Sequence, residues 1–405
     1  MKIWHLTKTL LGGAGQYALR LSNALRAAGF ESTVLLRDGP GAGGALLLKR
    51  KDSPVRHFAA RVFRSLSHRI ALSPWHSIHG LELYKPPLPI LPGDIIHLHG
   101  PMDWIGVTGL ERFIPPHARV FQTVHGGWEI SGGCVTRAGT ECQRFTSGCA
   151  RCPAIRTPWK SLARFELKTK SRFATKHRIR PIANSTWTAG MIRRSFVYRG
   201  VLDVPLIHPI LHEAFLASDL NGLRSSLKIS KRTRVIALGA RAVTDRYKGI
   251  AAFLEQISAL DEFASNTLIL LFGDGCIHCP ENLKVIDLGA VTEAEVAKIL
   301  GASDVFVSPS SVESFGMLLI EAQAVGTPVV GFEVGGTRDA VFPGMAENLV
   351  PLRRWDLLFE KVSQVLKEPR REHPEVRAWT QKCFSASTIT EKQLQCYGLS
   401  SSALV

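Results

Sequence analysis

Short apolar runs rich in β-branched residues alternate along the chain with longer stretches in which apolar residues recur at helical spacing. Strands joined by crossover helices produce this alternation, so it predicts βαβ units and parallel sheets. The runs form two sets, and each set is large enough for one doubly wound sheet. The predicted strands are 2–6, 32–37, 94–98, 119–124, 181–183 and 205–207 in the first set and 234–238, 267–272, 284–288, 305–308 and 328–332 in the second.

The boundary between the two sets falls between Ile207 and Arg234, in a stretch that contains Pro209 and the polar segment 217–221. A chain of 405 residues, 45% of them hydrophobic, can bury a core in each of two domains. We therefore expect an α/β fold with one domain over 1–210 and a second over 211–370. A polar tail over 371–405 is expected to pack back on the first domain.

Charge narrows the classes of partner. The formal net charge is +16, and the segment 151–180 holds ten Lys and Arg residues against one acid, Glu166. This charge favours nucleic acid, an acidic lipid or a phosphorylated ligand. Nucleic acid is the weakest of the three, because the basic runs lack interleaved aromatics. No apolar stretch approaches the roughly 20 residues that span a bilayer, and the N-terminus lacks a signal-peptide core, so we expect a cytoplasmic protein.

Residues 55–70 form a basic amphipathic pattern. Apolar residues recur at helical spacing with basic residues between them; the apolar set is Val55, Phe58, Val62, Phe63, Leu66 and Ile70, and the basic set is Arg56, Arg61, Arg64, His68 and Arg69. This pattern is typical of helices that dock on anionic membrane surfaces, and it also occurs in helices that pack on their own domain. Both interpretations stay open at this point.

The strongest motif follows the predicted strand 305–308. It reads Pro-Ser-Ser-Val-Glu-Ser-Phe-Gly-Met-Leu-Leu-Ile-Glu-Ala over 309–322, with Glu313 in a loop and Glu321 in a helix that begins near Gly316. First-turn N–H groups have no partner within their helix and suit a diphosphate. Glu313 can reach the hydroxyls of a sugar, and Glu321 can accept hydrogen bonds from ribose. The candidate donor-binding residues are Ser314, Phe315, Gly316, Met317, Leu318 and Glu321.

Two further motifs lie at the ends of predicted strands. Gly239-Ala240-Arg241 follows the strand 234–238, and Lys248 opens the next helix. Helix N-termini disfavour cations, so Arg241 and Lys248 indicate an anionic ligand or an acidic partner. Gly12 and Gly13 follow the first strand, where glycine either lets backbone N–H groups approach a phosphate or simply permits the turn.

Together these motifs resemble the retaining glycosyltransferases of family 4, over nearly the whole chain. The resemblance implies the GT-B fold, in which two facing Rossmann-like domains, one for the acceptor and one for the nucleotide-sugar donor, flank a cleft. It implies that Arg241 and Lys248 grip the donor diphosphate and that Glu313 contacts the transferred sugar. The remaining donor-site residues it implies are Glu321 at the ribose and Gly12, Gly13 and Gly239 beside the diphosphate.

The segment from His125 to Cys134 reads His-Gly-Gly-Trp-Glu-Ile-Ser-Gly-Gly-Cys. It resembles the subgroup that builds colanic-acid-type exopolysaccharides, which implies that His125 hydrogen-bonds the donor sugar and makes Trp128 an acceptor-side candidate. Relatives in that subgroup carry Asp directly after the histidine, where this chain has Gly126, and the difference bears on acceptor binding.

Histidines and cysteines provide two more candidate clusters. His97 and His99 end the third predicted strand on one side of it, where His99 either faces an acceptor or satisfies nearby backbone groups. Four thiolates could hold a structural zinc ion, although only the last two cysteines have tight ligand spacing, and free or disulfide-bonded thiols are the alternative. These thiolates belong to Cys134, Cys142, Cys149 and Cys152.

The resemblance implies a hexosyltransferase that moves a sugar from a UDP- or GDP-sugar to a glycolipid or polysaccharide precursor at the inner face of the cytoplasmic membrane. It implies retention by front-face substitution, without a metal or other cofactor, so that catalysis depends on positioning and charge stabilisation. The implied catalytic residues are His125, Arg241, Lys248 and Glu313. A nucleotide-sugar epimerase of the same fold and a basic nucleic-acid-binding protein are the alternatives.

Overall fold

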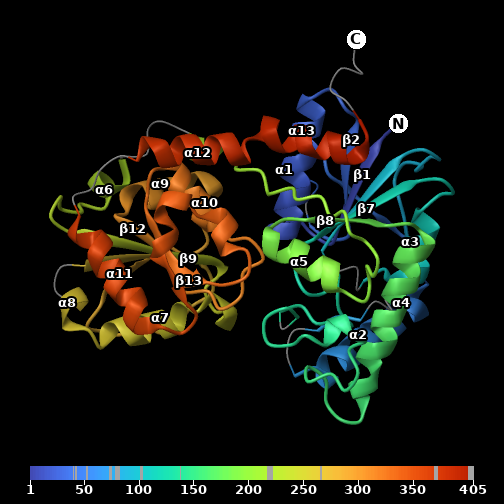
Figure 1. Cartoon of the computed structure of the whole chain (residues 1–405), viewed down its shortest axis with the longest axis horizontal. Helices are drawn as coiled ribbons and strands as arrows, with labels where there is room; N and C mark the ends of the chain where they lie inside the picture. The colour runs from blue at the N-terminus through green and yellow to red at the C-terminus, as the bar shows by residue number, and fades with distance from the viewer. Residues whose placement is uncertain are drawn as a thin grey trace. The chain divides into compact units, whose positions relative to one another are not determined.

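The computed structural model describes residues 1–39, 41, 43–51, 53–72, 75–77, 83–100, 104–136, 138–216, 222–264, 267–368 and 373–399. The chain divides into a first unit, Met1–Ile210 with Ala386–Val405, and a second unit, Leu211–Ser385. Each unit is built on one six-stranded sheet flanked by helices (Figure 1). The expected α/β fold with two Rossmann-like sheets is confirmed.

The sheet of the first unit has the order β3-β2-β1-β6-β7-β8 and is parallel throughout. Its strands are β1 Ile3–Thr7, β2 Ser32–Leu36, β3 Leu46–Leu47, β6 Ile95–His99, β7 Arg119–Val124 and β8 Arg180–Ala183. The strand predicted over 205–207 is only a bridge between Ala183 and Leu206, because Pro205 has no N–H to extend the ladder. A separate antiparallel pair joins β4 Lys49–Arg50 to β5 Tyr84–Lys85.

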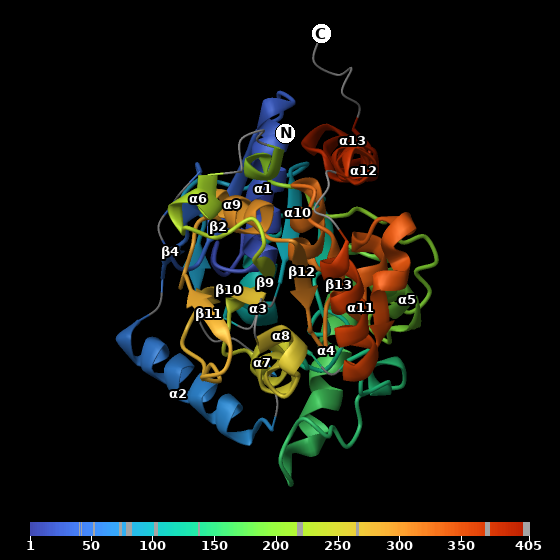
Figure 2. The same cartoon turned by 90° about the vertical axis from the view of Figure 1, so that its left-hand side faces the viewer.

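The helices of the first unit are α1 Gly13–Ala27, α2 Pro54–Ile70, α3 Gly106–Phe113, α4 Leu162–Lys176, α5 Thr186–Arg194 and α13 Ala386–Tyr397. Figure 2 shows the predicted amphipathic helix, α2, as one long continuous helix. Its Ala60 and Ser67 are buried, whereas its apolar stripe, Val55, Phe58, Val62 and Leu66, is between 41% and 79% exposed. These four side chains are therefore not part of the core of the unit, whereas Ile70, at the end of the helix, packs against it. The side chains of Arg56, Phe63, Arg64 and His68 lie outside the described residues.

The second unit repeats the architecture with the parallel order β11-β10-β9-β12-β13-β14. Its strands are β9 Arg234–Ala242, β10 Thr267–Asp274, β11 Lys284–Asp287, β12 Val305–Ser308, β13 Val329–Glu333 and β14 Leu349–Pro351. Its helices are α6 Gly222–Ser226, α7 Ile250–Ser258, α8 Asp261–Ala264, α9 Glu293–Ala302, α10 Met317–Ala324, α11 Trp355–Lys367 and α12 Pro374–Phe384.

Strand β9 is buried on both faces, as a central strand of a parallel sheet should be. Ile236 and Leu238 belong to the core under α7 and α11. Val235 and Ala237 belong to the core on the other face, with residues of α9, α10 and α12. A strand covered on both faces reads as a continuous apolar run, which is why these strands could be predicted from sequence.

The segment expected as a polar tail folds into two helices that belong to different units. On α12, Phe384 packs against Phe315 with ring centroids 5.7 Å apart, inside the second unit. On α13, Ile389, Leu394 and Tyr397 join the core of the first unit around Ile3. Few apolar residues carry the periodicity of either helix, so composition alone makes the segment look polar. Within the described ranges, no helix is long and apolar enough to cross a bilayer.

Candidate functional site

Strand order reverses at the centre of each sheet, between β1 and β6 in the first unit and between β9 and β12 in the second. Doubly wound sheets bind ligands outside the carboxyl ends of the strands at this point. The predicted site residues follow these strands. Gly12 comes after β1 and His99 ends β6, while Arg241 lies near the end of β9 and Glu313 follows β12.

The structure brings together Lys248 and Glu313, 65 residues apart in sequence. The Lys248 ammonium donates to Oε1 of Glu313 at 2.5 Å, with side chains 32% and 15% exposed respectively. Burial lowers the pKa of Lys248, but the adjacent Glu313 carboxylate more than offsets this, so the pKa of Lys248 lies above its ordinary value. Lys248 therefore stays positively charged, and its ion pair with Glu313 fixes its position.

Backbone contacts hold the loops that carry this ion pair. The Ser311 N–H donates to the Tyr247 carbonyl at 2.8 Å. Gly249 has φ of 69°, and a side chain there would place Cβ 2.1 Å from the Pro309 carbonyl oxygen. The Gly336 N–H donates to the carbonyl of Glu313 at 3.1 Å. The loops after β9, β12 and β13 thus form one unit around Glu313.

Helix α10 begins next to this ion pair. Its N-cap, Gly316, has φ of 102°, which favours glycine, and α10 itself runs from Met317 to Ala324. Leu318 is half-buried in its first turn, and Glu321 is 6% exposed in its second turn. The first-turn N–H groups point out of the helix end, where an anion is favoured.

Some predicted donor-site residues have a packing role. Phe315 is 2% exposed, so its side chain is not available to a ligand, whereas the neighbouring Ser314 is half-buried. A side chain at Gly239 would lie 2.4 Å from the Phe272 ring, so packing alone requires glycine there. Arg241 is exposed near the end of β9.

The loop between β1 and α1 depends on Gly15, which follows the predicted donor-site residues Gly12 and Gly13. A Cβ on Gly15 would lie 2.1 Å from the Thr9 carbonyl oxygen, whereas one on Gly13 would have no atom within 4 Å. Gly12 caps α1 with φ of 103°. The loop therefore folds tightly over Gly15 and leaves open space at Gly13, where the helix N-terminus is accessible to an anion.

His125 opens a loop held by buried charges. Its N–H donates to Oε1 of Glu129 at 3.2 Å, and burial raises the pKa of Glu129 to about 7. The Lys170 ammonium donates to the carbonyls of Trp128 and Ser131 and lies 3.7 Å from the centroid of the Trp128 ring. Glu129 and Lys170 were not predicted, because α4, which carries Lys170, is distant in sequence from the loop that carries Glu129.

Two acceptor-side candidates are buried, contrary to expectation. Trp128 is 3% exposed, and its indole N–H donates to the His76 carbonyl at 2.9 Å. His99 is fully buried, because Tyr17 and His125 pack over it with ring centroids 5.6 and 5.5 Å away. Both side chains are covered by other residues in this structure, so an acceptor-side role for either stays a prediction.

The cysteine cluster does not fit a zinc ion as the structure places it. None of the four residues is in a disulfide bond. Among the described residues, three ligand atoms lie within 4.8 Å of one another only in His5, His97 and His99. The sulfur atoms of Cys134, Cys142, Cys149 and Cys152 do not meet that limit, so the zinc interpretation is not supported.

Comparison with known proteins assigns both parts of the chain. Residues 11–204 match the family described as Glycosyltransferase Family 4, and residues 232–368 match Glycosyl transferases group 1. The two matches together cover most of the chain and support a glycosyltransferase of family 4 with the GT-B fold. Sucrose-phosphate synthase from Thermosynechococcus elongatus shares this fold with a TM-score of 0.67 at 17% identity over 98% of both chains. Anabaena HepE, in complex with UDP and glucose, gives a TM-score of 0.63 at 15% identity over 98% of this chain and 99% of its own.

A curated relative is the D-inositol 3-phosphate glycosyltransferase of Mycolicibacterium vanbaalenii, which is 30% identical over 165 residues, or 36% of this chain and 37% of the relative. The chain spans less than half the length of the curated relatives it matches. These relatives carry the name D-inositol 3-phosphate glycosyltransferase. Membership of the colanic-acid subgroup therefore stays a prediction.

Proposed function

We propose that this protein is a retaining, metal-independent hexosyltransferase that uses a UDP- or GDP-sugar and a lipid-linked acceptor. The ion pair of Lys248 with Glu313 carries the proposal. It sets a cation that can take diphosphate charge beside a carboxylate that can accept hydrogen bonds from sugar hydroxyls, at the switch point where such sheets bind ligands. The names of the matching families favour transfer over epimerisation.

The proposed reaction is front-face substitution at the anomeric carbon. A bond forms between the acceptor oxygen and that carbon, the bond to the donor phosphate oxygen breaks, and the same phosphate oxygen takes the acceptor proton. Arg241, Lys248 and the first-turn N–H groups of α10 stabilise the departing diphosphate. Glu321 binds the ribose, and His125 donates a hydrogen bond to the transferred sugar.

The lipid-linked acceptor is inferred from α2. Val55, Phe58, Val62 and Leu66 present an exposed apolar stripe, and Arg61 and Arg69 are exposed on the same helix. Such a helix binds at the surface of anionic membranes, where lipid-linked precursors lie. A soluble phosphorylated cyclitol is the second candidate acceptor, favoured by the D-inositol 3-phosphate named for the relatives.

The first experiment is a thermal-shift screen of the full chain against UDP, GDP and their sugars, because a ligand of the folded state raises the melting temperature. The donor found is then assayed with lipid-linked and inositol phosphate acceptors, with and without EDTA, and the anomeric configuration of the product is read by NMR. Turnover of the donor alone to an isomeric nucleotide sugar would support the epimerase instead.

The site assignment is tested with Lys248→Ala and Glu313→Ala. Each should lower kcat by about a hundredfold or more, since each removes a charged contact to the transition state. Lys176→Ala is the matched control, because it removes an ion pair with Glu111 of 2.8 Å at the end of α4 that precedes β8, away from the strand carboxyl ends. Normal turnover by a folded Glu313→Ala protein would remove Glu313 from the mechanism.

A further inference from the structure

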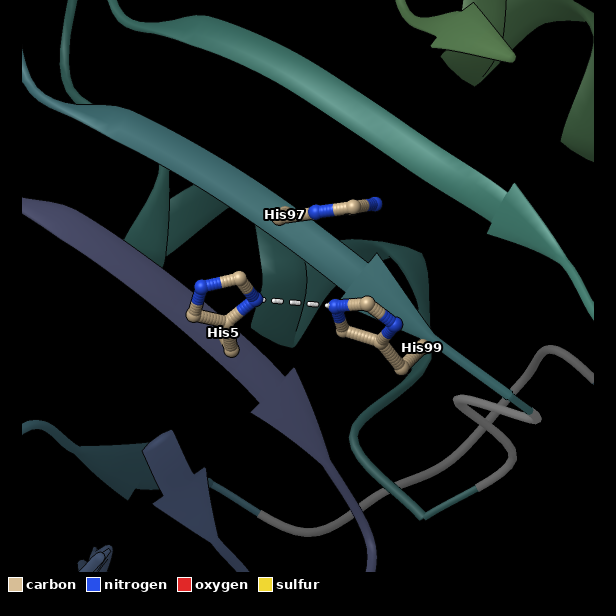
Figure 3. A group of neighbouring side chains, drawn as sticks. All are labelled: His5, His97 and His99. Carbon is tan, nitrogen blue, oxygen red and sulfur yellow. Dashed lines mark hydrogen bonds between the residues drawn. The ribbon is translucent and has the colours of Figure 1, made fainter. Parts of the chain in front are cut away.

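Three histidines form a hydrogen-bonded chain across the central strands of the first unit. A hydrogen bond of 3.0 Å joins Nδ1 of His5, on β1, to Nε2 of His99, at the end of β6 (Figure 3). A second, of 3.3 Å, joins Nδ1 of His99 to Nε2 of His125, directly after β7. The chain thus leads from a fully buried ring to half-buried His125, the predicted sugar contact.

Burial keeps these imidazoles neutral. It holds the pKa of His5 and of His125 at about 3 and the pKa of His99 well below its usual range. A neutral imidazole carries one N–H and one bare nitrogen, so each ring can donate to one neighbour and accept from the other. The donors along this row of histidines can therefore all point from His5 toward His125 or all point the other way. In the first case Nδ1 of His125 carries a hydrogen and Nε2 of His5 does not, and in the second case the reverse holds.

The far end of the chain decides the direction. Nε2 of His5 is buried and has no hydrogen-bond partner within the described ranges. If the chain ran from His125 to His5, this nitrogen would carry an unsatisfied buried N–H, which is rarer and more costly than an unsatisfied acceptor. Running from His5 to His125, the chain leaves only a bare nitrogen there. His5 then donates to His99, and His99 donates to His125.

We propose that His5 and His99 are positioning residues that set the tautomer of His125, so that its Nε2 accepts from His99 and its Nδ1 presents an N–H to the transferred sugar. The contact between Nδ1 of His125 and a sugar rests on the proposed function. The tautomer of His125 does not depend on that function. Tyr17 packs edge-on against His125 with ring centroids 5.1 Å apart, which further limits rotation of the ring.

A fourth histidine lies beside the chain without joining it. His97 bonds through Nδ1 to the Tyr397 hydroxyl at 2.6 Å and through Nε2 to the Thr123 hydroxyl at 2.8 Å. Both of its nitrogens are thus engaged, so a metal ion held by His5, His97 and His99 would have to displace one of these hydroxyls. Tyr397→Phe is therefore a control, because it removes the hydrogen bond to His97 and leaves the hydrogen bonds between His5, His99 and His125 in place.

The tautomer is tested first by NMR of the full chain labelled with ¹⁵N-histidine, since the nitrogen shift separates a protonated from a bare ring nitrogen. We expect His125 to be protonated at Nδ1, in wild type and in Tyr397→Phe. Protonation of His125 at Nε2 would overturn the proposal. So would a stoichiometric metal ion in the purified protein that is lost in His5→Gln.

A pair of substitutions at His99 then tests the effect on transfer. Asn places its amide near the position of Nδ1, facing His125, whereas Gln places it near Nε2, facing His5. We expect His99→Asn to keep kcat within about threefold and His99→Gln to lose about tenfold, the value of one hydrogen bond. Equal losses in two variants that melt like wild type would mean that His99 only fills space. If the wild type transfers no sugar at all, the proposed function fails, but the NMR result still shows which nitrogen of His125 is protonated.

Discussion

Acidification should destabilise the first unit through its buried histidines. His5, His97 and His99 are 0% exposed, and burial holds the pKa of each well below the ordinary 6.5, that of His5 at about 3. Below pH 6.5 the unfolded chain binds a proton at each ring and the folded chain does not. The free energy of unfolding is therefore unaffected by these rings above pH 6.5 and decreases as the pH falls below 6.5.

The size of the loss follows from the unfolded value alone, provided that the folded rings stay neutral at the test pH. One pH unit corresponds to about 1.4 kcal/mol per group, so at pH 5 each ring costs about 2 kcal/mol and the three together about 6 kcal/mol. Glu129 acts in the opposite sense, because burial raises its pKa to about 7. Its protonation between pH 8 and pH 5 offsets about 2.5 kcal/mol of this loss. The net loss is still a large part of the 5–15 kcal/mol typical of a domain.

A substitution separates the histidine contribution from all others. Urea unfolding followed by tryptophan fluorescence at pH 8 and pH 5 gives the stability lost by wild type and by His97→Gln. The variant should lose about 2 kcal/mol less than wild type between these pH values, whatever its stability at pH 8. His117→Gln, at an exposed histidine of the same unit, should lose as much as wild type. An equal loss in wild type and His97→Gln would refute the reasoning.

Three other expectations concern the loops and α2. Gly15→Ala should cost about 2 kcal/mol or more in urea unfolding, because its Cβ would meet the Thr9 carbonyl at 2.1 Å. Gly13→Ala, with open space, should change stability by under about 0.5 kcal/mol, and similar losses in both would contradict the packing argument. Phe58→Ser should weaken binding to phosphatidylglycerol vesicles, measured by sedimentation at low salt, at least about fivefold. Leu202→Ser, at an exposed loop residue, should not weaken it. Equal recovery of the wild-type protein with neutral and with anionic vesicles would end the membrane proposal. Lys170→Met should lower the free energy of unfolding by about 3–5 kcal/mol in urea unfolding, because it leaves the buried Glu129 and Glu166 without the neighbouring positive charge. An unchanged unfolding midpoint would show that Lys170 has no structural role.

The strands and the motif loops were predictable because both are written in short stretches of sequence. A strand buried on both faces must be apolar along its length, as Arg234–Ala242 is in its first part, whatever the rest of the chain does. Glycine where φ is positive, as at Gly316, is likewise a local requirement. The placing of Lys248 and Glu313 near one sheet edge followed from the rule that carboxyl ends of parallel strands share an edge.

Burial and partnership of polar side chains depended on the tertiary structure. His99 and Trp128 lie in loops and strand ends that look accessible in sequence, yet both are covered by residues from other elements. His5 and His99 are 94 residues apart, and His97 and Tyr397 are 300 apart. Sequence periodicity says which face a residue lies on, but not which distant side chain packs over it. The sequence alone therefore determined the two sheets and the loops that carry the candidate site residues, and only the folded chain decided which of those side chains are buried and which distant side chains they contact.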